Sequence, residues 1–141
     1  NFYRVMTGLP GTVVRDPALD APAQAAALMM SANSSLSHSP PTSWACYTAA
    51  GASGAGSSNL ALGAGGARAI ELYIDDFGSG NTPVGHRRWI LHPPQVRMGT
   101  GSTSSGNGRS AANALYVFGG SEPRPVAPAF VAWPSPGYVP Y

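Results

Sequence analysis

The stretch from residue 81 to 93, Asn-Thr-Pro-Val-Gly-His-Arg-Arg-Trp-Ile-Leu-His-Pro, limits the local structure more than any other part of the chain. Thr82 followed by Pro83 is typical of a helix start, because threonine caps the first turn and proline at the first helical position lacks only an N–H that would be unpaired. Pro93 and Pro94 must end that helix, since a residue before proline avoids the α conformation. We therefore predict a short helix that presents His86, Arg87 and Arg88, with Trp89 and Ile90 or Leu91 in the core.

The length and composition of the chain limit the class of protein. The 141 residues suffice for one domain with a modest core. The single cysteine, Cys46, cannot form a disulfide within the chain, and we expect a small buried residue or a bond to another chain. The eight basic residues are all arginines and lie scattered, with only Arg87 and Arg88 adjacent, which argues against nucleic-acid binding. No apolar run is long enough to cross a membrane, so no transmembrane segment is expected.

The start of the chain leads to an expectation about the protein from which it comes. It begins at Asn1, without an initiator methionine or the pattern of a signal peptide. We expect a mature or excised piece of a longer product.

Apolar periodicity predicts three further helices. Residues 1–8 carry Phe2, Tyr3 and Met6, which fit one face of a short helix. A longer amphipathic helix is indicated by the regular spacing of Leu19, Ala23, Ala26 and Met30. A third covers 67–77 and has Gly78 as its C-terminal cap.

Two carboxylates fall in the last turn of the third predicted helix, where the helix dipole disfavours them. Asp75 and Asp76 therefore either pair with cations nearby, such as Arg87 and Arg88, or one of them is held there for a site.

The remaining pattern is short strands and loops. Residues 59–62 are expected to be extended, and residues 95–102 and 111–119 to form a hairpin around a Ser-Ser-Gly-Asn-Gly-Arg turn. Three or four helices with a hairpin, and with room for a third strand, indicate an α+β domain. In residues 121–141, six prolines alternate with Phe130, Trp133 and Tyr138. This segment is predicted to be either a strap docked on its own domain or a linker.

Several short segments resemble, in order and spacing, the bacterial branch of the CAP superfamily. That superfamily comprises cysteine-rich secretory proteins, antigen 5 and plant pathogenesis-related 1 proteins, whose domain is also called SCP. The similar segments span about residues 1–120: Asn1 with Arg4, 23–27, Ser37-His38-Ser39, Ser58-Asn59-Leu60, 69–76, the Gly-His-Arg-Arg-Trp-Ile-Leu of 85–91, 98–101 and 116–118.

The resemblance implies an α-β-α sandwich with a three-stranded antiparallel sheet between helical layers, and a central cleft lined by two histidines and two acids. By position, His38 and His86 match the two histidines, and Asp76 falls where the second acid, usually Glu, would be. The first acid of the family is absent, because Ser58 stands before Asn59 in its place.

Three uses of this cleft follow. His38, His86 and Asp76 are plausible ligands for Zn²⁺ or another divalent cation, with the alternative that the histidines are hydrogen-bonded and hold no metal. Ser58 as nucleophile, a histidine as base and Asp76 as orienter would make a protease-like or esterase-like hydrolase. The resemblance favours the third use, a secreted or cell-surface, non-catalytic module without an obligatory cofactor. It would bind a lipid, a small molecule or a protein, and residues 121–141 would contact other domains or subunits.

Overall fold

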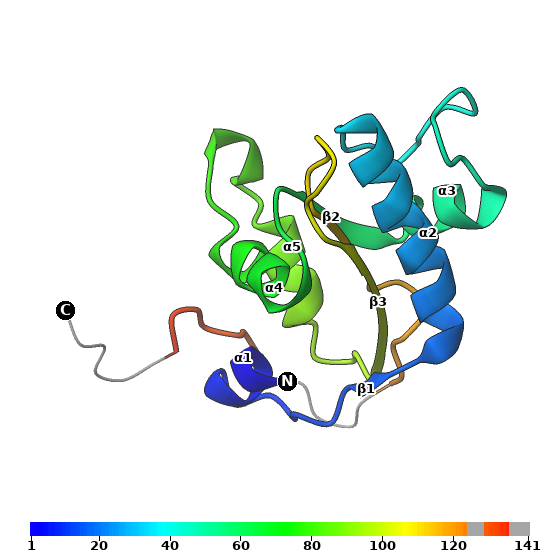
Figure 1. Cartoon of the computed structure of the whole chain (residues 1–141). Helices are drawn as coiled ribbons and strands as arrows, with labels where there is room; N and C mark the ends of the chain where they lie inside the picture. Colours follow the sequence, from blue (N-terminus) through cyan, green and yellow to red (C-terminus); the bar gives the residue numbers. More distant parts are fainter. Residues whose placement is uncertain (124–128, 136–141) are drawn as a thin grey trace.

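The computed structural model describes residues 1–123 and 129–135. Within them the chain forms five α-helices, one 3-10 helix and four strands (Figure 1). In chain order they are α1 (Phe2–Met6), β1 (Val14–Arg15), α2 (Pro17–Asn33), α3 (Ala49–Gly56), β2 (Ser58–Leu62), α4 (Gly66–Asp75), η1 (Ser79–Asn81), α5 (Gly85–Ile90), β3 (Arg97–Thr103) and β4 (Ala112–Tyr116).

The four strands form one mixed sheet in the order β1-β3-β4-β2. The predicted hairpin is present, since β3 and β4 pair antiparallel with Gly101 opposite Ala114, and β2 pairs antiparallel with β4. The predicted three-stranded antiparallel sheet is present in part: β3, β4 and β2 pair antiparallel, but β1 adds a fourth, parallel strand beside β3. Both residues of β1 are exposed, so no apolar pattern indicated this strand.

Helices cover both faces of the sheet. On β4, Ala112 and Ala114 pack with α2 and α3, while Leu115, and Val117 just after the strand, pack with α4 and α5. This alternation is the two-residue period of a strand that is buried on both faces. Figure 1 shows the resulting layers, with α2 and α3 on one side of β3 and α4 and α5 on the other.

The longest helix, α2, is held against the sheet through small residues. Asp16 caps its start, accepting from the amide of Ala18 at 2.9 Å, and Pro22 is accommodated inside the helix. A side chain at Gly101 on β3 would collide with the backbone of α2 at Ala23 and Gln24. The alanine-rich face of α2 therefore lies directly on the strand.

The short helix α1 turns a different face inward from the one predicted. Phe2 and Met6 are 69% and 51% exposed, whereas Arg4 is 1% exposed. The Arg4 guanidinium donates to the carbonyls of Ile90 and His92 at 2.8 and 2.9 Å. Because buried carbonyls need donors, Arg4 joins the first helix to the chain leaving α5.

The helix that carries His86 starts later than the sequence predicted. Thr82 and Pro83 lie in the turn after η1, and α5 begins at Gly85 behind Val84, whose φ is 46°. Leu91 and Ile90 are buried as expected, but Trp89 is 36% exposed and is not a core residue. Cys46 is likewise exposed, against the expectation of burial.

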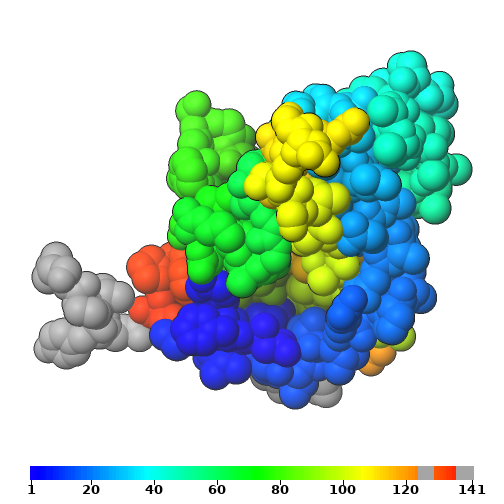
Figure 2. Space-filling model, in the orientation of Figure 1, coloured from blue at the N-terminus to red at the C-terminus, as the bar shows by residue number. Residues whose placement is uncertain are grey.

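Part of the C-terminal segment lies on the domain. Residues 129–135, red in Figure 2, lie beside the blue N-terminal segment that contains α1. The rings of Trp133 and Tyr3 meet there at 5.4 Å, and Val131 and Trp133 pack on the cluster that contains Ile90 of α5. This contact agrees with the strap alternative for these residues; Tyr138 lies outside the described part of the chain. None of the helices in residues 1–123 and 129–135 combines the length and the apolar character needed to span a bilayer.

Candidate functional site

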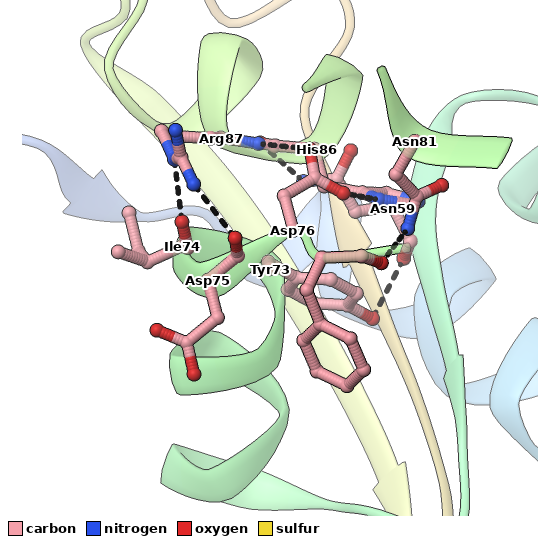
Figure 3. A network of polar contacts seen from close by, with 9 residues as sticks. Asn59, Tyr73, Ile74, Asp75, Asp76, Asn81, His86 and Arg87 are labelled. Atoms are coloured by element: carbon pink, nitrogen blue, oxygen red, sulfur yellow. Dashed lines mark hydrogen bonds and ion pairs between the residues drawn. The ribbon is translucent and has the colours of Figure 1, made fainter. Parts of the chain in front are cut away.

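The turn after α4 places a carboxylate beneath α5. The helix ends at Asp75, and Asp76 adopts a left-handed conformation with φ 43°, which Asp tolerates better than most residues. Asp76 and not Gly78 is thus the residue that ends this helix. The Arg87 guanidinium donates to the carbonyls of Ile74 and Asp75, at 2.5 and 2.6 Å, and so caps α4 (Figure 3). The predicted pairing of Arg87 with a carboxylate is therefore replaced by bonds to backbone oxygens.

The buried carboxylate of Asp76 holds His86. Its Oδ1 lies 2.8 Å from His86 Nδ1, and its Oδ2 accepts the backbone N–H of Arg87 at 3.2 Å. The Asp76 side chain is 1% exposed and that of His86 is 30% exposed. Since an ionised carboxylate only accepts, Nδ1 carries the proton, and Nε2 is the nitrogen left to accept from a ligand.

Tyr73 and Asn59 make further contacts with His86. The imidazole ring stacks on the Tyr73 ring with centroids 5.4 Å apart, and the backbone carbonyl of His86 accepts from the Asn59 amide at 3.0 Å. The Tyr73 hydroxyl lies 2.9 Å from Asn113 Oδ1. Burial raises the pKa of Tyr73 far above its usual range, so the phenol keeps its proton and remains a donor.

His86 opens onto a cavity of about 350 Å³. This volume falls within the range of roughly 300–1,000 Å³ that is usual for small-molecule sites. We call it the histidine cleft, and its lining comes from α3, β2, η1, α5 and the end of β4: His38, Gly56, Ser58, Asn59, Gly80, Asn81, Pro83, Gly85, His86, Trp89, Val117 and Phe118. Of the four residues predicted for the site, three line the cleft, and Asp76 lies behind His86.

His38 reaches the histidine cleft from an exposed loop. Its Nδ1 lies 2.8 Å from the carbonyl of Ala55, near the end of α3. A carbonyl can only accept, so His38 also carries its proton on Nδ1. Both histidines therefore have Nδ1 bonded to the protein.

Ser58 is the one predicted residue without a partner of its own. It is 4% exposed, and its Oγ has no hydrogen-bond partner in the described part of the chain. Neither histidine is therefore bonded to this hydroxyl, and the predicted triad of Ser58, histidine and Asp76 is not assembled. A serine nucleophile needs that bond to its base.

The predicted metal ligands do not meet as a set. Within residues 1–123 and 129–135, no three His, Cys, Asp or Glu side chains gather closely enough to hold a metal ion. Both oxygens of Asp76 accept from His86 and Arg87, which leaves the carboxylate as a support for the imidazole. His38, His86 and Asp76 therefore do not form a three-ligand cluster in the described part of the chain.

Sequence reasoning missed two groups of the histidine cleft. The Asn59 amide was noted only as part of an extended segment, and Trp89 was assigned to the core. The rings of Trp89 and Phe118 meet at 4.5 Å and 62° on the wall of the cleft. An aromatic residue directly before the Ile-Leu pair of a very short helix was the available signal, because three successive positions cannot all face the core.

Comparisons with known proteins give one match. No curated protein and no solved structure matches the chain. The family model described as the cysteine-rich secretory protein family, CAP, matches residues 1–119, which include every element from α1 to β4 and all the predicted site residues. On this evidence, the chain belongs to the CAP family of cysteine-rich secretory proteins.

Proposed function

We propose that this CAP domain is a non-catalytic binding module that holds its ligand in the histidine cleft. One observation carries the proposal. Asp76 fixes His86 through Nδ1 at 2.8 Å, and this leaves Nε2 as an oriented acceptor on the wall of a ligand-sized cavity. The ring also stacks on Tyr73, and the Asn59 amide donates to the backbone carbonyl of His86. Such a group is suited to recognising a donor on a ligand.

The hydrolase alternative has no comparable support. The Ser58 hydroxyl is buried and has no hydrogen-bond partner among residues 1–123 and 129–135, and the only cysteine of the sequence, Cys46, lies outside the cleft lining. An oriented imidazole without a bonded nucleophile favours recognition over covalent catalysis.

The place of action follows from the family. The family description names secretory proteins, and this supports a secreted or cell-surface domain. The Gly-His-Arg-Arg-Trp-Ile-Leu segment of 85–91 supports the bacterial branch. Contacts with other domains or subunits would use the surface around residues 129–135.

A fragment titration tests the module. Mixtures of small amides, alcohols and imidazoles are added to ¹⁵N-labelled protein, and amide shifts are followed by NMR. We expect shifts at Ser58, Asn59 and His86, and their loss in His86→Ala. Asp75→Ala, whose exposed carboxylate makes none of the contacts of the cleft, is the matched control and keeps them. The absence of any fragment that shifts these residues would contradict the proposal.

An activity assay covers the alternative. We expect 4-nitrophenyl acetate and casein to be cleaved no faster by the wild type than by His86→Ala. Turnover that is lost in His86→Ala and also in Ser58→Ala would instead establish a hydrolase.

A further inference from the structure

We propose that the ligand of the histidine cleft is a neutral, linear oligosaccharide that stacks one sugar ring on Trp89. This inference rests on the proposed function and names its ligand class. It starts from two aromatic side chains on the wall of the cleft, Trp89 at 36% exposure and Phe118 at 41%. Large aromatic rings left open to water beside a cavity are typical of ligand contacts.

The aromatic pair lines two hollows. One is the histidine cleft, and the other is a second cavity of about 340 Å³ that shares Trp89, Val117 and Phe118 with it and is completed by His92, Gly119 and Ser121. A ligand crossing Trp89 would therefore enter both. This arrangement favours a chain of several units over a single compact molecule.

The linings of both hollows exclude other classes of ligand. Histidines aside, neither contains a charged side chain. Phosphate groups of nucleotides and nucleic acids are bound mainly through arginine and lysine, and neither lining contains one of these residues. A lipid chain would cover the Nε2 atoms of His38 and His86 without giving them hydrogen bonds, which is costly for polar groups.

A sugar satisfies both kinds of surface. One face of a pyranose ring carries C–H bonds that are attracted to the negative face of an indole, and its edge carries hydroxyls that donate and accept. His86 Nε2 accepts from such a hydroxyl, because Asp76 keeps the proton on Nδ1.

Ser58 supplies an independent sign of a missing partner. Its residue is 96% buried in the cleft wall, and its Oγ has no partner among the described residues. A native structure rarely leaves a buried hydroxyl unpaired. A change of χ1 rotamer moves this oxygen without moving β2, so that a ligand hydroxyl becomes its partner.

The test uses four neutral tetrasaccharides, cellotetraose, maltotetraose, mannotetraose and the N-acetylglucosamine tetramer. Tetragalacturonate and AMP serve as anionic comparisons. The readout is the indole N–H signal of each of the three tryptophans in ¹⁵N-labelled protein. We expect at least one neutral tetrasaccharide to shift the Trp89 signal and the amides of Asn59 and Phe118, and to bind more tightly than its monosaccharide.

Variants assign the contact. Trp89→Ala is expected to weaken binding about tenfold, while Trp89→Phe, which keeps a ring, loses less. Phe118→Ala is a second variant at the platform, and Phe130→Ala, with its ring 80% exposed on the C-terminal segment, is the control that binds like wild type. The signals of Trp44 and Trp133 report whether each variant is folded.

Each possible result of these experiments either supports or overturns the oligosaccharide inference. If no tetrasaccharide moves Trp89, or if binding is unchanged in Trp89→Ala, the inference is wrong. Tighter binding of tetragalacturonate or AMP also overturns it. If small fragments still shift the cleft residues, the binding module stands and only the sugar is refuted; if neither fragments nor sugars act there, both proposals fall.

Discussion

At the scale of single residues, the site depends on one buried carboxylate. Asp76 accepts from His86 Nδ1 and from the Arg87 amide, and its neighbour Asp75 is exposed and uses only its backbone carbonyl. The two adjacent aspartates are thus chemically different. Asp76 supports the histidine cleft, whereas Asp75 lies on the surface.

This difference gives a matched pair of variants. Asparagine tolerates the left-handed conformation of Asp76, so Asp76→Asn removes the charge and one acceptor without straining the backbone. We expect a loss of about 1–3 kcal/mol in the free energy of unfolding, since hydrogen bonds to charged groups contribute about that much. Urea unfolding measures it. Asp75→Asn should change the same free energy by less than about 0.5 kcal/mol.

The same variant has a spectroscopic consequence that a purely structural role would not produce. In the wild type, long-range ¹⁵N NMR should find His86 protonated on Nδ1 when neutral. In Asp76→Asn the two tautomers should mix, because the amide can also turn its NH₂ toward the ring. An unchanged tautomer in the variant would contradict the orienting role of Asp76.

His92 gives the protein a pH dependence. Burial, and secondarily the charge of Arg4, lower the pKa of His92 below its usual value of about 6.5. The unfolded chain therefore binds a proton more readily than the folded one as the pH falls below that value. The contribution of neutral His92 to stability is complete above about pH 6.5 and is lost as the pH falls through the pKa of the folded state.

Replacing this side chain should flatten the pH profile. In His92→Gln, the free energy of unfolding should fall less between about pH 7.5 and pH 5 than in the wild type. Chemical denaturation at several pH values checks this. Equal losses in the two proteins would refute the assignment.

At the scale of single residues, the resemblance predicted which residues belong to the site but not the contacts that they make. The resemblance pointed to His38, Ser58, Asp76 and His86, but neither it nor residue spacing indicates that Arg87 caps α4 through carbonyls, or that Ser58 is unbonded. Those outcomes depend on where the turn after Asp76 places each donor. Such geometry is a tertiary property and leaves no periodic signal in the sequence.

At the scale of elements, prediction succeeded where apolar periodicity was strong. The helices α2 and α4 and the β3-β4 hairpin were found near their observed bounds. The predicted start of α5, at Pro83, was wrong. Val84 takes a positive φ, which ends the preceding turn, so the first helical residue is Gly85. The helix α3 consists of Ala, Gly and Ser alone, and its Gly51 and Gly54 lie directly against α2, so packing more than propensity accounts for it.

The contact between α2 and β3 can be tested at one glycine. In Gly101→Ala, the new methyl group would collide with backbone atoms of Ala23 and Gln24, which no side-chain rotation relieves. Overpacking of this kind costs about 1–3 kcal/mol. We expect thermal unfolding to show a lower Tm for this variant. Gly106→Ala, where nothing lies within 4 Å of the added carbon, is the control and should leave the Tm nearly unchanged.

At the scale of the whole molecule, the family resemblance predicted the layers better than the strand count. Helices cover both faces of the sheet, and the added parallel strand β1 extends it beside β3. Arg4 then connects α1 to the end of α5 across 86 positions of sequence. No local pattern predicts this buried arginine, because four of the carbonyls that accept from its guanidinium, those of Ile90, His92, Pro93 and Gln95, come from a distant part of the chain.

Residues 129–135 of the C-terminal segment pack against the core of the domain. Trp133 and Val131 pack against the core cluster that contains Leu9, Ile90 and Leu91, and the Trp133 ring meets Tyr3 edge to face at 5.4 Å. If residues 129–135 are a strap that stabilises this domain, Trp133→Ala should lower the free energy of unfolding by about 1–3 kcal/mol, less than the roughly 3–5 kcal/mol of a fully buried tryptophan. Phe130→Ala removes a ring of the same segment that is 80% exposed, so its effect should stay below about 0.5 kcal/mol. Equal, negligible effects of both variants in urea unfolding would instead mean that this segment contributes nothing to the isolated domain and is free to serve as a linker.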